Sequence, residues 1–183
     1  MRRIILGSNS PRRLQLLEGA GFQVTRISSG ADEDFETSMN LEEVAMYLAE
    51  KKMDAIAPQE DIVLTADTTV VFPDLILNKP ENEAEVRYML GKLSGNMHKV
   101  ITGVCMRKGD QKVLFKDETK VWFRELTEEI ISHYLKTGNP YDKAGAYGIQ
   151  DSIGYLGIER IEGCFYNVMG LPIRKVYEQY IKF

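Results

Sequence analysis

The stretch from Ile62 to Phe72 constrains the fold more than any other part of the sequence. It is rich in β-branched residues and almost continuously apolar, which predicts a strand covered on both faces. Asp67 interrupts this run at its middle. A buried carboxylate is costly unless a cation, a metal or hydrogen-bond donors meet it. Asp67 is therefore either half of a structural ion pair or part of a functional site, and its place in a buried strand favours the site.

A second informative stretch lies near the N-terminus. Ile4–Leu6 predicts a short buried strand, and Ser10 followed by Pro11 predicts the start of a helix. Arg12 and Arg13 then fall in the first helical turn, where the helix dipole and unpaired N–H groups already favour negative charge. A bound phosphate would explain both arginines, held by backbone N–H groups, serine hydroxyls and guanidinium groups. The alternative is a solvated pair of arginines beside acidic side chains.

Two further stretches carry weaker signals. The small residues of 142–150 let a backbone approach a ligand closely, although they serve tight packing equally well. This loop is neither a P-loop nor a dinucleotide-binding fingerprint. Lys79 precedes Pro80, which favours an extended conformation for the lysine. Such a lysine either reaches a phosphate or lies on the surface.

Composition excludes several classes of protein. A chain of 183 residues suggests one domain, or two lobes that share a sheet. A net charge of −4 disfavours the broad basic face that nucleic acid requires, so we expect no nucleic-acid partner. We also expect no membrane association, because no stretch approaches the ~20 apolar residues of a membrane span. The apolar run near Met1 is too short for a signal peptide. Together with two distant cysteines in apolar surroundings, Cys105 and Cys164, this predicts a cytoplasmic protein with reduced thiols.

The two histidines, His98 and His133, are too few for a His/Cys metal cluster, so any metal must be a hard ion bound by carboxylates. We expect His98 to make a structural hydrogen bond. Lys51 and Lys52 lie near the C-terminal end of a predicted helix capped by Asn40, where their charge suits the helix dipole. That is a sufficient structural explanation for both lysines.

Alternation and helical periodicity predict several other elements. They include three antiparallel strands, a helix that Thr127 caps and a closing hairpin. The strands are expected at 98–106, 112–115 and 119–123, and the arms of the hairpin at 156–161 and 165–169.

Six short motifs follow one another along nearly the whole chain. They are Ser8-Asn9-Ser10-Pro11-Arg12-Arg13, Ala66-Asp67-Thr68, Lys79-Pro80, Leu93-Ser94-Gly95 with His98, Asp142-Lys143-Ala144-Gly145-Ala146-Tyr147-Gly148-Ile149-Gln150, and Asn167-Val168-Met169-Gly170-Leu171-Pro172. In this order they resemble the Maf family of nucleoside triphosphate pyrophosphatases.

The resemblance implies an α/β fold with a curved mixed β-sheet flanked by helices, and two lobes with a central cleft, an ITPase-like or Maf-like architecture. It further implies a single Maf-like domain over residues 1–183, assembly as a homodimer, and hydrolysis of a nucleotide between its α- and β-phosphates. The pattern around Arg13, Thr68 and Gln150 resembles the branch that acts on dTTP and UTP. The branch that acts on 7-methyl-GTP tends to carry a tryptophan where Arg12 stands.

The resemblance also implies roles for individual residues. Asp67 matches the proposed proton acceptor, and Arg12, Thr68 and Gln150 match positions linked to base choice. Further positions in the cleft match Glu33, Lys52 and Lys79. The sequence departs from the family pattern after Gln150, where Asp151 and Ser152 replace the commoner small glycines, and at Asn9, where a small residue is usual. Both departures leave the chemistry intact and bear on the fit of the base.

These features combine into a mechanistic hypothesis. Cleavage of a phosphoanhydride needs charge stabilisation and an oriented water more than covalent chemistry. We expect Mg²⁺, or Mn²⁺, bound by phosphate oxygens with Asp67 and Glu33, and Asp67 acts either as base or as metal ligand. The expected substrate-binding residues are Ser8, Ser10, Arg12, Arg13, Lys52, Thr68, Lys79 and Gln150.

The alternative function is a non-catalytic nucleotide-binding regulator of septum formation, since Maf-like proteins are also associated with septum arrest. A protein that only senses an anion has no need for a carboxylate beside the phosphate. Asp67 therefore favours the enzyme.

Overall fold

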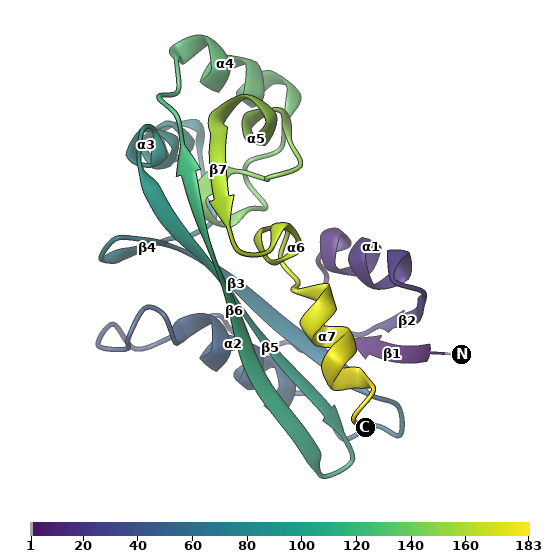
Figure 1. Cartoon of the computed structure of the whole chain (residues 1–183). Coiled ribbons are helices and arrows are strands. Elements are labelled where there is room, and N and C mark those ends of the chain that lie inside the picture. Colours follow the sequence, from purple (N-terminus) through teal and green to yellow (C-terminus); the bar gives the residue numbers. More distant parts are fainter. Residues whose placement is uncertain (1) are drawn as a thin grey trace. The chain divides into compact units, whose positions relative to one another are not determined.

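The computed structural model describes residues 2–183, which fall into two compact units. Unit 1 holds the described residues up to Thr68, with Thr102–Asp117 and Gly170–Phe183; unit 2 holds Thr69–Ile101 and Glu118–Met169. Each unit is built on part of one seven-stranded sheet, whose strand order is β2-β1-β3-β5-β6-β7 with β4 paired to β3. Figure 1 labels these elements.

The strands are β1 (Arg2–Leu6), β2 (Phe22–Arg26), β3 (Val63–Phe72), β4 (Leu75–Leu77), β5 (Met97–Lys108), β6 (Gln111–Phe123) and β7 (Ile158–Glu162). The helices are α1 (Pro11–Gly19), α2 (Val44–Asp54), α3 (Glu83–Leu93), α4 (Glu128–Thr137), the 3₁₀ turn η1 (Ala144–Ala146), α5 (Ser152–Gly157), α6 (Phe165–Val168) and α7 (Ile173–Tyr180). β1 runs parallel to β2 and β3, whereas β4 and β7 pair antiparallel with β3 and β6. The sheet is therefore mixed, and the predicted α/β class is confirmed.

In unit 1 the residues leading into and along β3 alternate between two cores. Ile62, Leu64 and Ala66 belong to the cluster that includes side chains of α1 and α7. Val63 belongs instead to the cluster that includes Ala49 and other residues of α2. Successive side chains of a strand point to opposite faces, so helices cover this strand on both sides, as its apolar sequence predicted.

Helix α2 packs against the sheet at close range. A Cβ on Gly103 of β5 would lie 2.3 Å from the carbonyl oxygen of Ala45, so any side chain there would push the helix away. On β3, the Thr65 hydroxyl donates to the Ala49 carbonyl oxygen at 2.6 Å. These two contacts fix the position of α2, and with it the side chains near the C-terminal end of that helix.

Unit 2 has its own apolar core, in which Phe123, Tyr134 and Tyr147 are buried. His98 stacks on the Phe123 ring, and its Nε2 lies 2.7 Å from the Tyr147 hydroxyl. The expected structural hydrogen bond of His98 is thus confirmed. Burial lowers the pKa of His98 to about 3, because the apolar surroundings disfavour the imidazolium.

Three predictions of local structure are wrong for physical reasons. The two later strands of the predicted trio form one strand, β6, because its polar middle is held by ion pairs of Lys116 with Glu43 and Asp117 with Lys175. The second arm of the expected hairpin is helix α6, on which the amide of buried Asn167 donates to the Val100 carbonyl oxygen at 3.0 Å.

The third correction concerns α2, which begins at Val44 rather than directly after Asn40. The Asn40 side chain accepts from the Glu42 amide at 3.0 Å and so stabilises a turn before the helix. Both cysteines are free, as predicted, and burial raises the pKa of the Cys105 thiol to about 12. Within residues 2–183, the helices are all too short or too polar to cross a membrane.

Candidate functional site

The turn between β1 and α1 approaches β3 closely. The Gly7 amide donates to the Leu64 carbonyl oxygen at 2.8 Å, and a Cβ on Gly7 would lie 2.7 Å from the Thr65 side chain. Ser10 caps α1, accepting from the Arg13 amide at 3.5 Å, and its own amide donates to the Ser8 hydroxyl at 3.2 Å. The predicted cap is confirmed, and the two serines shape the first turn of α1.

Arg13 is buried at this helix terminus, with 8% of its surface exposed. Its Nε donates to the Gly170 carbonyl oxygen at 2.9 Å, Nη1 to the Ser8 hydroxyl at 3.1 Å and Nη2 to the Thr68 hydroxyl at 3.1 Å. All three acceptors are neutral. Burial lowers the pKa of Arg13, an effect opposed by the charge of Asp67.

A buried cation with neutral partners is unusual, because desolvating a charge is costly without a countercharge. An anion at this position would supply the countercharge, and the guanidinium group suits the oxygens of a phosphate. The interpretation of a solvated arginine pair is therefore wrong for Arg13. Arg12 is partly exposed and has interactions of its own.

Lys52, Asp67 and Glu33 form a second group in unit 1. The Lys52 ammonium donates to Oδ1 of Asp67 at 2.5 Å and to Oε1 of Glu33 at 2.8 Å. Lys52 and Asp67 are 8% and 9% exposed, whereas half of the Glu33 side chain is exposed. The helix dipole alone therefore does not explain Lys52. It remains a fair account of Lys51, which pairs with Asp32 at the surface.

Asp67 and Thr68 are neighbours on β3 and turn in different directions. Asp67 meets Lys52 of α2, and Thr68 meets Arg13 of α1. The Thr68 hydroxyl oxygen also lies 3.0 Å from the hydroxyl oxygen of Thr102 on β5. The alternation of the strand thus supplies an acid to one face and a hydroxyl to the other.

The other two predicted site residues belong to unit 2. Lys79 is exposed after β4 and has interactions within the described chain. Gln150 is partly buried, and its Oε1 is shielded from solvent without a hydrogen-bond partner among residues 2–183. An unpaired buried acceptor costs about 1–3 kcal/mol.

Sequence reasoning missed several contacts of these residues. Gly170 supplies a carbonyl oxygen to Arg13, and Thr102 supplies a hydroxyl to Thr68. The motif that contains Gly170 was a usable signal, whereas nothing local marks Thr102. Nothing local marks the contact between Tyr134 and Asp151 either, which in unit 2 joins helix α4 to the turn that carries Gln150.

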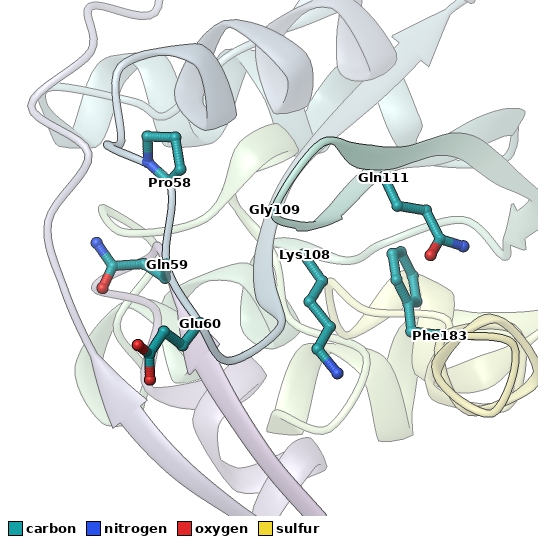
Figure 2. A pocket seen from close by; sticks show the side chains of 7 residues that line it. All are labelled: Pro58, Gln59, Glu60, Lys108, Gly109, Gln111 and Phe183. Carbon is teal, nitrogen blue, oxygen red and sulfur yellow. The ribbon is translucent and has the colours of Figure 1, made fainter.

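A surface hollow of about 670 Å³ lies elsewhere in unit 1 (Figure 2). Residues 58–60, Lys108, Gly109, Gln111 and Phe183 line it. None of the predicted site residues takes part.

Nearly the whole chain is similar to known proteins. A family model described as Maf-like protein matches residues 3–183. A dTTP/UTP pyrophosphatase from Parabacteroides distasonis is 46% identical over 97% of this chain and 94% of its own length. Another protein of that name, from Geobacillus sp. (strain WCH70), is 44% identical over 98% and 97%. Among solved structures, the Ham1 protein of Staphylococcus aureus shows 16% identity and a TM-score of 0.43, over 67% of this chain and 72% of that one.

Proposed function

Because the chain belongs to the Maf family, we propose that it hydrolyses dTTP and UTP to the monophosphate and pyrophosphate. The relatives that carry the name dTTP/UTP pyrophosphatase match it over nearly its full length. The chain is accordingly a hydrolase that acts on acid anhydrides.

The observation that carries the proposal is the buried Arg13 with neutral partners only. In our proposal its guanidinium group binds a phosphate of the substrate, whose charge offsets the cost of burying the arginine. Arg12 and the serines of the same turn add charge and hydrogen bonds around that phosphate, as the N-terminus of a helix commonly does.

Asp67 is the proposed proton acceptor. The Lys52 ammonium donates to Oδ1 of Asp67, so we assign Oδ2 to orient or deprotonate the attacking water. Lys52 is thereby assigned to Asp67 rather than directly to the phosphates.

A divalent cation fits the donor chemistry of this group. No cluster of three or more His, Cys, Asp or Glu suited to a metal occurs among residues 2–183. Two carboxylates, Asp67 and Glu33, nevertheless share one ammonium, and Mg²⁺ typically binds one or two carboxylates together with waters and substrate phosphates. Asp67 and Glu33 would hold Mg²⁺ or Mn²⁺, which would neutralise developing charge on the phosphates.

Base choice is proposed to rest on Gln150. Its buried, unpaired Oε1 matches the N3–H donor of uracil and thymine, whereas cytosine has an acceptor at that position. A pocket that leaves a buried polar group unpaired discriminates strongly against the wrong substrate. Lys79 is proposed to contact the phosphates, and Thr68 to hold Arg13 in place.

The test is a product assay with the purified protein, Mg²⁺ and each of UTP, dTTP, CTP, GTP and 7-methyl-GTP. We expect monophosphate and pyrophosphate from UTP and dTTP at rates well above those from the other three. A preference for either guanine nucleotide would overturn the assignment, and release of inorganic phosphate would overturn the cleavage position. Omitting Mg²⁺, then adding Mn²⁺, tests the cation.

The same assay separates the enzyme from a regulator that binds nucleotide without turnover. A regulator would show a rise in melting temperature with UTP but no product. Assembly as a homodimer, a cytoplasmic location and a link to septum formation stay predictions, and the first is tested by sedimentation at several protein concentrations.

A further inference from the structure

A second group of polar side chains, two of them buried, lies in unit 2 around the turn that carries Gln150. Asp151 accepts from the Tyr134 hydroxyl at 3.3 Å through Oδ2, and the Lys143 ammonium lies 3.4 Å from the same oxygen. Tyr134 is fully buried, and only 9% of the Lys143 side chain is exposed. Burial and the neighbouring Asp151 both raise the pKa of Tyr134, so the phenol keeps its proton and acts as donor.

The position of Asp151 makes this arrangement informative. Asp151 is the N-cap residue of α5, where an aspartate side chain normally accepts from the amides of the first helical turn. Here the side chain makes no capping hydrogen bond. The carboxylate turns instead toward Lys143 and Tyr134, from two other segments of unit 2, so its contacts are long-range rather than local.

The backbone links this carboxylate to Gln150. The Asp151 amide donates to the Gly148 carbonyl oxygen at 3.0 Å and closes a four-residue turn in which Gln150 is the third residue. The carboxylate also lies over the start of the turn, because a Cβ on Gly148 would be 2.6 Å from its Oδ2. On the far side, the Gly154 amide donates to the Asp151 carbonyl oxygen at 2.9 Å.

We propose that Asp151, held by Tyr134 and Lys143, is a positioning residue that fixes the Gly148–Asp151 turn and thereby aims Gln150 at a base bearing a ring N–H. This inference rests on the proposed function, in which Gln150 selects the base. It adds Asp151, Tyr134 and Lys143 as residues that determine specificity without contacting the nucleotide. An acceptor that is free to swing away discriminates poorly, so a fixed turn is a condition for selectivity.

The first experiment measures kcat and KM for UTP and CTP in the wild type, Asp151→Ala, Asp151→Asn and Tyr134→Phe. Asp151→Ala should lower kcat/KM for UTP about tenfold, mainly through KM, and change that for CTP little. Asp151→Asn keeps an acceptor for Tyr134, so it should lose about threefold, as should Tyr134→Phe. Glu159→Gln, which removes an exposed carboxylate on β7, is the matched control and should match the wild type.

The second experiment needs no substrate. Hydrogen–deuterium exchange of the nucleotide-free protein should be faster at residues 148–154 in Asp151→Ala than in the wild type or Glu159→Gln. A purely structural Asp151 would lower the melting temperature and leave the UTP/CTP ratio unchanged, which would overturn the inference. Unchanged exchange at 148–154 would overturn it as well. A wild type that cuts no pyrimidine triphosphate would instead refute the proposed function, while the exchange result still decides whether Asp151 holds the turn.

Discussion

Arg13 in unit 1 and Lys143 in unit 2 are buried to the same extent, at 8% exposed each, but their partners differ in charge. Arg13 has three neutral oxygens around it. Lys143 has the carboxylates of Asp142 and Asp151 together with the Asn139 carbonyl oxygen. A buried cation therefore does not mark a binding site by itself. Arg13 has no acidic hydrogen-bond partner among the described residues, which is why we propose a phosphate beside it, whereas Lys143 is already paired with acids that hold the structure in place.

The sharpest test makes the same change in two aspartates that are each paired with a buried lysine. Asp67→Asn should lower turnover of UTP by a factor on the order of 10² or more, because it removes the proposed base or metal ligand. Asp151→Asn should lower it by less than tenfold. Equal, small effects on kcat would remove Asp67 from catalysis, provided that circular dichroism shows both variants folded.

A second test compares the two cations directly. Lys143→Met should lower the free energy of unfolding by about 2 kcal/mol, because two partly exposed carboxylates lose their countercharge. Arg13→Ala should cost about 1 kcal/mol or less, since neutral hydrogen bonds are lost while the cost of burying a charge disappears. Urea unfolding without ligand measures both.

Pyrophosphate should affect the two variants in the opposite order. It should raise the melting temperature of the wild type and of Lys143→Met through preferential binding to the folded state, but not that of Arg13→Ala. An equal rise in Arg13→Ala would show that the anion binds away from α1.

The third test uses His98 in unit 2, whose buried imidazole stays neutral. His98 has a folded-state pKa of about 3 against an ordinary 6.5, so between these pH values the unfolded chain binds a proton at His98 and the folded chain does not. Its contribution to stability is complete above pH 6.5 and is lost progressively as the pH falls toward 3. At pH 5 the loss should be about 2 kcal/mol relative to pH 7. His98→Gln cannot titrate, so its unfolding curves at pH 7 and pH 5 should differ less; an equal difference would contradict the assignment.

The smallest expected effect belongs to Gln150. Gln150→Ala should lower the preference for UTP over CTP about tenfold while reducing kcat for UTP less, because it removes the acceptor for N3–H and leaves the chemistry at the phosphates. Competition between UTP and CTP in one reaction measures the ratio directly. A preference that stays at the wild-type value would move base selection to another residue.

Local chemistry explains which features could be predicted from the sequence. Ser10 and Thr127 cap their helices because capping depends on residues three positions away. Asp67 could be singled out because a charge in an apolar run is conspicuous. The polar middle of β6 gave no such signal, since the side chains that neutralise it, such as Glu43 and Lys175, come from distant segments.

The candidate site shows the same limit. The position of Lys52 at a helix end suggested the dipole, and only the approach of α2 to β3 reveals its contact with Asp67, 15 residues later. The burial of Arg13 likewise depends on the Gly170 carbonyl oxygen, 157 residues away. The kinds of side chain in the site were predictable, but their pairing was not.

The alternation of β3 also limits how this protein can change during evolution. Substitutions along the strand alter one face at a time, but inserting or deleting a single residue between Leu64 and Asp67 would exchange the faces of all residues beyond it. The carboxylate would then point to the Arg13 side and the hydroxyl to the Lys52 side. A change of two residues would restore the faces but displace both groups by about 6.6 Å along the strand. Homologous chains should therefore vary in length in their surface turns, and keep the length of this strand constant.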